Sequence, residues 1–108
     1  ILNLFTMDKI MTTKHYNPNY KPGITQALGI TGSSAAIANG HGADIRDVRI
    51  VTTVDAYVEF GATPTATTNS LILPAFTPEH FKVQPGDKIA FLLVGSTTGQ
   101  ARVTELTQ

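Results

Sequence analysis

The chain has 108 residues, a length typical of one domain. Its 8 basic and 8 acidic residues give a formal net charge of zero, which argues against strong electrostatic attraction to nucleic acid or anionic lipid. The absence of cysteine excludes disulfides, thiol catalysis and zinc–thiolate sites. No apolar run reaches the roughly 18–20 residues that span a bilayer.

The first ten residues include a short apolar patch between positions 1 and 5. No basic segment precedes this patch and no small-residue cleavage site follows it, so we do not expect a signal peptide. The chain begins with Ile, and Met7 and Met11 follow, so a natural start at either methionine is an open alternative.

Residues 1–23 are expected to form an extended N-terminal arm. The stretch 12–23 is polar and rich in turn residues, and its prolines disfavour helix in the residues that precede them. One interpretation is a flexible leader. The other is a strap that lies on a neighbouring subunit, with Tyr16 and Tyr20 as anchors.

Residues 24–30 alternate large and small side chains, which predicts a first strand. Residues 33–38 fit either a second strand or a single helical turn that ends at Asn39-Gly40. In both cases residues 39–42 form a loop.

The clearest pattern runs from residue 48 to residue 60. Its even positions are mostly apolar: Val48, Ile50, Thr52, Val54, Ala56, Val58 and Phe60. Because side chains alternate faces along a strand, these positions form one apolar face. The run is longer than the usual strand of about 3–10 residues. We therefore expect a bulge or tight reversal near Thr53 and Asp55 that divides it into two strands.

Further short strands are predicted in the C-terminal half, at residues 70–73, 81–84, 88–94 and 101–106. Turn-rich segments separate them, and the apolar run 88–94 is typical of a central strand covered on both faces. The sequence thus predicts an all-β protein with one domain at residues 24–108, a β-sandwich or jelly-roll-like fold of about seven to eight antiparallel strands. The expected core is Ile50, Val54, Val58, Phe60, Leu71, Leu73, Phe81, Val83, Ile89, Phe91, Leu93 and Val103.

Candidate catalytic and metal-binding groups are few. The three histidines share no ligand-pair spacing, and His41 with Asp44 and Asp47 does not match a calcium loop, so an ordinary polar loop is favoured there. No serine lies in a nucleophile motif, and the glycines of residues 29–34 lack the ending of a phosphate loop. We expect no catalytic residue, no metal and no cofactor.

One polar cluster has two interpretations. Asp55 and Glu59 flank Tyr57 on one face of a predicted strand. They form either a solvated face or a polar subunit contact centred on Tyr57, because aromatic residues are enriched in interface cores.

Three segments carry a distinctive order of turns and strand ends: residues 58–66 (VEFGATPTA), residues 73–90 (LPAFTPEHFKVQPGDKIA) and residues 101–106 (ARVTEL). Together they resemble the small virion proteins encoded in the structural modules of tailed bacteriophages. The shared pattern consists of turns and strand ends, covers roughly residues 24–106 and carries no functional residues. The resemblance implies a β-sandwich protein of the phage particle, located in the virion after assembly in the host cytoplasm, without enzymatic activity.

Within this setting we expect a capsid decoration (cement) protein that binds over joints between major capsid subunits and stabilises the head. Charged residues form only 15% of the chain, which suits extensive contact with other subunits and equally a plain β-sandwich. The expected partners are the major capsid protein, other virion proteins and further copies of the chain, with a trimer as one option. No nucleic-acid or membrane partner is expected. The alternatives are a tail, fibre-base or head–tail adaptor component, and a carbohydrate-binding module, which the absence of Trp disfavours.

Overall fold

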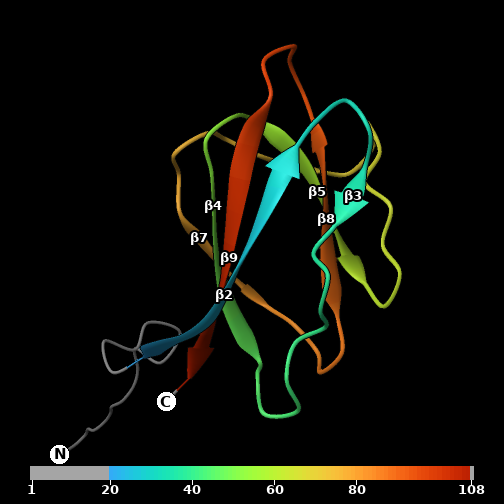
Figure 1. Cartoon of the computed structure of the whole chain (residues 1–108). Coiled ribbons are helices and arrows are strands. Elements are labelled where there is room, and N and C mark those ends of the chain that lie inside the picture. Colours follow the sequence, from blue (N-terminus) through green and yellow to red (C-terminus); the bar gives the residue numbers. More distant parts are fainter. Residues whose placement is uncertain (1–19, 108) are drawn as a thin grey trace, which may run out of the picture.

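The computed structural model describes residues 20–107, and strands dominate this part of the chain (Figure 1). The strands are β2 Lys21–Ile30, β3 Ala35–Ala36, β4 Asp47–Thr52, β5 Ala56–Gly61, β6 Leu71–Leu73, β7 Glu79–Lys82, β8 Lys88–Leu93 and β9 Gly99–Thr107. The described residues contain no helix, which confirms the predicted all-β class. Within residues 20–107 there is accordingly no helix with the length and apolarity to cross a membrane.

The described strands form two antiparallel sheets of four strands each. The first sheet has the order β2-β9-β4-β7 and the second has the order β3-β8-β5-β6. The pairing is nested: β5 pairs with β6, β4 with β7, β3 with β8 and β2 with β9. Every connection between consecutive strands crosses to the other sheet, except the one from β5 to β6. The fold therefore depends on pairing between strands that are far apart in the sequence, such as β2 with β9.

The core lies where the inward side chains of the two sheets meet, in a sandwich-like arrangement. Phe60 of the second sheet and Phe81 of the first contact each other with ring centroids 5.2 Å apart, which is a favourable separation for an aromatic pair. The buried apolar cluster comprises Ile30, Ile37, Ile45, Val48, Ile50, Ala56, Val58, Leu73, Val83, Ile89, Phe91, Ala101 and Val103. Burial of these side chains is the main stabilising contribution to the fold.

The predicted break in the long alternating run is confirmed. Residues 53–55 form a bend, so that β4 belongs to the first sheet and β5 to the second. Thr53 fastens this bend to β9: its N–H donates to the Gln100 carbonyl and its Oγ1 accepts from the Gln100 N–H, each at 2.9 Å. Buried residues occupy even positions on both sides of the bend, which is why the apolar period continued through it.

The first strand begins earlier than expected, at Lys21 instead of Ile24. Lys21 and Pro22 pair with the end of β9, and the register shifts between Pro22 and Thr25. Proline is tolerated here because β2 is an edge strand of the described sheet. Ile24 is 67% exposed and does not share the inward face of the later residues. Residues 1–19, which contain most of the predicted arm, lie outside the described residues.

The ambiguous segment 33–38 contains the two-residue strand β3, so the helical alternative is wrong. Of the predicted core, Leu71 is a correction: it is 52% exposed, because β6 has only three residues and pairs on one side only among the described strands. The predicted core residues that are buried are Ile50, Val58, Leu73, Val83, Ile89, Phe91 and Val103, whereas Val54, Phe60, Phe81 and Leu93 are partly buried against them.

Candidate protein-interaction site

Of the two predicted tyrosine anchors, Tyr16 lies outside the described residues, and Tyr20 contacts its own subunit. The Tyr20 hydroxyl donates to Asp47 Oδ2 at 3.2 Å, and Lys82 Nζ lies 3.1 Å from the other oxygen of the same carboxylate. Tyr20 and Asp47 also line a cleft of about 530 Å³. Tyr20 therefore fixes the point at which the chain enters β2 relative to β4.

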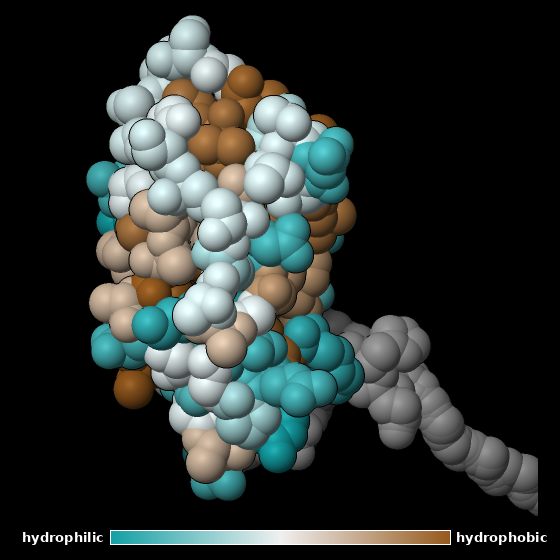
Figure 2. Space-filling view, turned by 90° about the vertical axis from the view of Figure 1, so that its right-hand side faces the viewer, coloured by the Kyte–Doolittle hydropathy of each residue, from teal (hydrophilic) through white to brown (hydrophobic). Residues whose placement is uncertain are grey.

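Tyr57 is the centre of an apolar row on the outer face of the second sheet. It pairs in register with Ile72 of β6 on one side and with Leu92 of β8 on the other. Tyr57 and Leu92 are half-buried, whereas Ile72 is 53% exposed. Figure 2 views the side of the molecule that carries β3 and β8, where brown apolar patches lie between pale surface of intermediate hydropathy.

The two carboxylates predicted to flank Tyr57 both have partners within the subunit. Asp55 precedes β5, and its Oδ1 accepts from the Ala75 N–H at 2.8 Å. Glu59 shares the outer face with Tyr57, and its Oε1 accepts from the Ser70 hydroxyl at 2.8 Å. Each carboxylate thus holds one end of the β6 region, which positions β6 against β5.

Residues 71–76, which we call the apolar segment, expose three large apolar side chains: Leu71 at 52%, Ile72 at 53% and Phe76 at 71%. Phe76 is also the only described residue other than glycine with a positive φ, at 56°. An L-residue in this left-handed conformation costs about 1–2 kcal/mol. An exposed bulky side chain on a residue with a strained backbone contributes little to the stability of the fold.

The backbone of Phe76 is held in place by the first sheet. Its N–H donates to the Thr52 carbonyl at 2.7 Å, at the end of β4. The side chain borders a groove of about 310 Å³ whose other lining residues are Val51, Thr52, Thr53, Gln100 and Arg102. The apolar segment therefore extends from the outer row of the second sheet to the outer face of the first.

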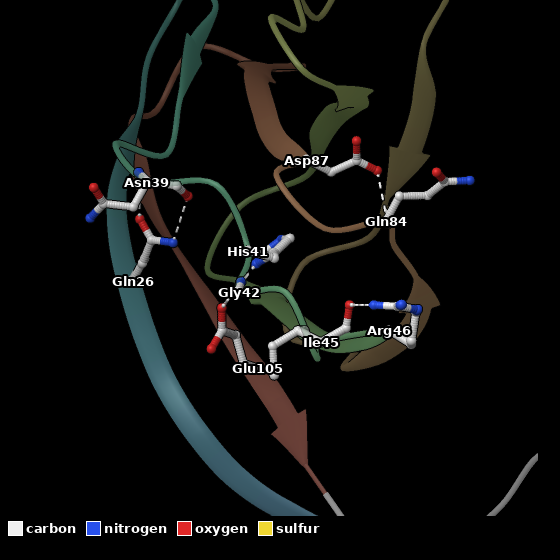
Figure 3. A network of polar contacts seen from close by, with 9 residues as sticks. All are labelled: Gln26, Asn39, His41, Gly42, Ile45, Arg46, Gln84, Asp87 and Glu105. Atoms are coloured by element: carbon white, nitrogen blue, oxygen red, sulfur yellow. Dashed lines mark hydrogen bonds and ion pairs between the residues drawn. The ribbon is translucent and has the colours of Figure 1, made fainter.

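Loop 37–46 differs from the apolar segment because several of its polar groups make contacts within the subunit (Figure 3). The side chain of His41 is fully buried, and its Nδ1 lies 3.5 Å from Oε2 of Glu105, which is itself 7% exposed. The same carboxylate oxygen accepts from the Gly42 N–H at 3.3 Å. Among the described residues neither ring nitrogen of His41 has a hydrogen-bond partner. The Glu105 carboxylate lies beside this ring and, through the Gly42 N–H, fastens the loop to β9.

Two further contacts fasten this loop. The Gln26 side chain donates to the Asn39 carbonyl at 3.0 Å and accepts from the Asn39 N–H at 3.1 Å, so that β2 holds the loop through a side-chain amide. His41 exchanges two backbone hydrogen bonds with the 86–87 turn, at 3.0 and 2.8 Å. Gly40 permits this approach, because a Cβ atom on it would lie 2.5 Å from the Gly86 carbonyl oxygen.

The conceivable cation site at His41, Asp44 and Asp47 does not assemble. His41 is buried against Glu105, Asp44 is exposed, and Asp47 contacts Tyr20 and Lys82. Within residues 20–107 no three His, Asp or Glu side chains are placed to hold a metal ion.

Sequence reasoning missed Phe76 as a surface residue. The signal was available, because Phe76 lies between Pro74 and Pro78 in a predicted turn. A large apolar residue between two prolines cannot continue a strand into the core and is a natural candidate for exposure.

Comparison of the chain with protein-family models, with curated proteins and with solved structures finds no match.

Proposed function

We propose that the protein is a non-enzymatic structural protein of a tailed-phage virion. In this role it decorates the capsid, binding over the joints between major capsid subunits and stabilising the head. The observation that carries the proposal is an all-β body whose large exposed apolar side chains include three in one short segment.

The strand order supports a more specific fold, the jelly roll. A jelly roll consists of eight strands in two sheets, and viral capsid proteins and lectins are two classes that use it. The nested pairs, from β5–β6 at the centre to β2–β9 outside, are those of one long hairpin folded over to form two sheets. This order fits a particle protein and equally a lectin, so the choice between them rests on the surface.

The surface supports the same role. Interfaces are enriched in aromatic residues at their centre, and contiguous exposed apolar side chains mark binding sites. The apolar segment supplies Ile72 to the row centred on Tyr57 on the outer face of the second sheet, and it places Phe76 beside the groove on the outer face of the first sheet. Repetition by the symmetry of a particle converts many weak contacts of this kind into stable attachment.

The test is the copy number of the chain in purified particles of the phage that encodes it, measured by quantitative mass spectrometry against the major capsid protein. If the protein decorates the capsid, its copy number should follow the number of joints between capsid subunits, on the order of hundreds per particle. About a dozen copies or fewer would instead assign the chain to the tail or to the head–tail adaptor. Absence from particles contradicts any virion role.

One observation favours a second candidate, a carbohydrate-binding module. Phe76 is an exposed aromatic beside a groove of about 310 Å³, and lectins share the proposed architecture. A glycan array tests this candidate: selective binding that Phe76→Ala abolishes supports it, and no binding on the array counts against it.

A further inference from the structure

The outer face of the first sheet carries an excess of basic side chains. The outward positions of β4, β7 and β9 hold three lysine or arginine residues and one acidic residue: Arg49, Lys82, Arg102 and Asp47. Glu79 and Glu105 occupy the alternate positions, in register with the inward Ile50 and Val48. Asp47 contacts Lys82, so the two arginines are the charges that make this face positive.

The two arginines are diagonal neighbours on this face. Arg49 pairs in register with Thr104, two residues beyond Arg102 on β9, and diagonal neighbours of this kind lie roughly 7–8 Å apart. On its other side Arg49 lies opposite His80 of β7. In an extended peptide, alternate side chains on one face are roughly 6–7 Å apart. Two carboxylates at alternate positions of such a peptide therefore match the spacing of the two arginines.

The guanidinium of Arg102 is held by its own strand. Its Nη1 donates to Gln100 Oε1 at 2.9 Å and to the Ala101 carbonyl at 3.1 Å. Both contacts use Nη1, and the other edge of the group, formed by Nε and Nη2, presents two parallel N–H donors. This edge matches the two oxygens of a carboxylate, and its orientation is fixed before a ligand arrives. Arg102 is thus placed to bind a carboxylate through two hydrogen bonds.

The groove beside Arg102 supplies an apolar wall. Val51 and Phe76 line it together with Arg102, and its volume is about 310 Å³. The backbone of Phe76 is tied to the Thr52 carbonyl, while its side chain is 71% exposed. Binding sites typically combine apolar walls with a few polar groups that fix the orientation of the ligand. This groove fits an apolar side chain that is followed closely by a carboxylate.

We propose that this face binds an acidic peptide segment of a partner protein. An apolar side chain of the segment packs against Phe76 and Val51, the next carboxylate pairs with Arg102, and a second carboxylate two residues further on reaches Arg49. A run of acidic residues fits better than one terminal carboxylate, because the basic groups continue from Arg102 through Arg49 to His80. The inference deepens the proposed function and rests on it in taking a protein as the occupant.

Fluorescence anisotropy with a labelled synthetic peptide and the purified full chain tests the inference. The probe has one phenylalanine with glutamates two and four positions after it, in a background of serine and glycine. Its matched counterpart has glutamines in place of both glutamates. We expect the glutamate peptide to bind at least about tenfold more tightly and to lose affinity as salt is added, because exposed charges are screened. Equal affinities, or binding of neither peptide, overturn the inference.

Variants of the chain locate the contact. Arg102→Gln should weaken binding of the probe at least about tenfold, and Arg102→Lys should recover only part of the loss, because an ammonium group lacks the two parallel donors. Phe76→Ala should weaken binding severalfold. The matched controls, Lys88→Gln and Ile72→Ala, remove a basic and an exposed apolar side chain from the second sheet and should leave binding unchanged. Normal binding by Arg102→Gln, or an equal loss in Lys88→Gln, overturns the inference.

Competition separates the peptide from other occupants. An oligosaccharide of uronic acids carries carboxylates on a different backbone, and we expect it to displace the probe less well than the unlabelled peptide does. More effective displacement by the oligosaccharide would assign the groove to an anionic glycan and overturn the inference. Self-association that Arg102→Gln abolishes would assign it to a second copy, with the same consequence.

The inference and the proposed function can fail separately. A chain that binds the peptide but is absent from particles contradicts the virion role alone. A chain that is present in hundreds of copies but does not distinguish the glutamate from the glutamine peptide contradicts the inference alone.

Discussion

Two parts of the chain lead from the second sheet to the first: loop 37–46, and residues 71–78, which comprise β6 and the connection that follows it. The two parts differ in the exposure of their apolar side chains. Loop 37–46 buries Ile37, Ile45 and His41, whereas the apolar segment 71–76 leaves Leu71, Ile72 and Phe76 exposed. Loop 37–46 therefore contributes to the stability of the fold, whereas the apolar segment carries exposed apolar surface, which the proposed function uses for binding.

The largest effect is expected when the buried contact in loop 37–46 is broken. His41→Ala removes a fully buried side chain and leaves a cavity beside Glu105, so we expect a loss of about 2–5 kcal/mol in the free energy of unfolding. Urea denaturation measures it. The double variant with Glu105→Gln should lose less than the sum of the two single variants. Additive losses would show that the two side chains do not interact.

The close approach of loop 37–46 to the 86–87 turn gives a second test. Gly40→Ala places a Cβ atom 2.5 Å from a backbone oxygen that cannot move freely, so the free energy of unfolding should fall by about 2–3 kcal/mol. Gly29→Ala is the control, because its new Cβ meets nothing within 4 Å and should change stability by less than about 1 kcal/mol. Equal effects of the two substitutions would contradict the described packing.

The apolar segment should respond in the opposite sense. Phe76→Gly relieves a φ of 56° and removes a side chain that is 71% exposed, so the free energy of unfolding should rise by up to about 1 kcal/mol. Binding to capsids should weaken at the same time. The measurement combines urea denaturation with cosedimentation on particles that lack the protein. A clear loss of stability would show that Phe76 belongs to the core.

The smallest effect is expected at Ile72, which is 53% exposed. Ile72→Thr keeps a β-branched side chain and should change the free energy of unfolding by no more than about 0.5 kcal/mol. The same substitution at the fully buried Ile89 should cost several times more, about 2–3 kcal/mol. Thermal or urea unfolding of both variants makes the comparison, and similar losses would argue that β6 is covered.

The sequence carried enough information to predict the strands and much of the inner face. In residues 48–60 the alternation of apolar and polar side chains continues through the bend, because the even positions of both β4 and β5 point into the core. Residues 88–94 were identified as a central strand, and β8 indeed lies between β3 and β5 with Ala90 fully buried on the face opposite Ile89 and Phe91. Burial of one face of a strand produces an alternation of apolar and polar residues that can be recognised in the sequence.

The sheet order and the surface could not be predicted in this way. Periodicity identifies a face but says nothing about which strand lies beside it, so Leu71 was assigned to the core although β6 is an edge strand. Ile37, Ile45 and His41 are buried by contacts with distant residues and have no local period. For the predicted interaction residues, Tyr20, Asp55 and Glu59 have hydrogen-bond partners inside the subunit that no spacing reveals.

Cryo-electron microscopy of purified particles, with and without the protein, tests the central claim most directly. We expect two-sheet density over the joints between major capsid subunits, with the apolar segment 71–76 at the contact and loop 37–46 away from it. Density confined to the tail, or a head contact made through loop 37–46 with the apolar segment facing solvent, would contradict the proposed function.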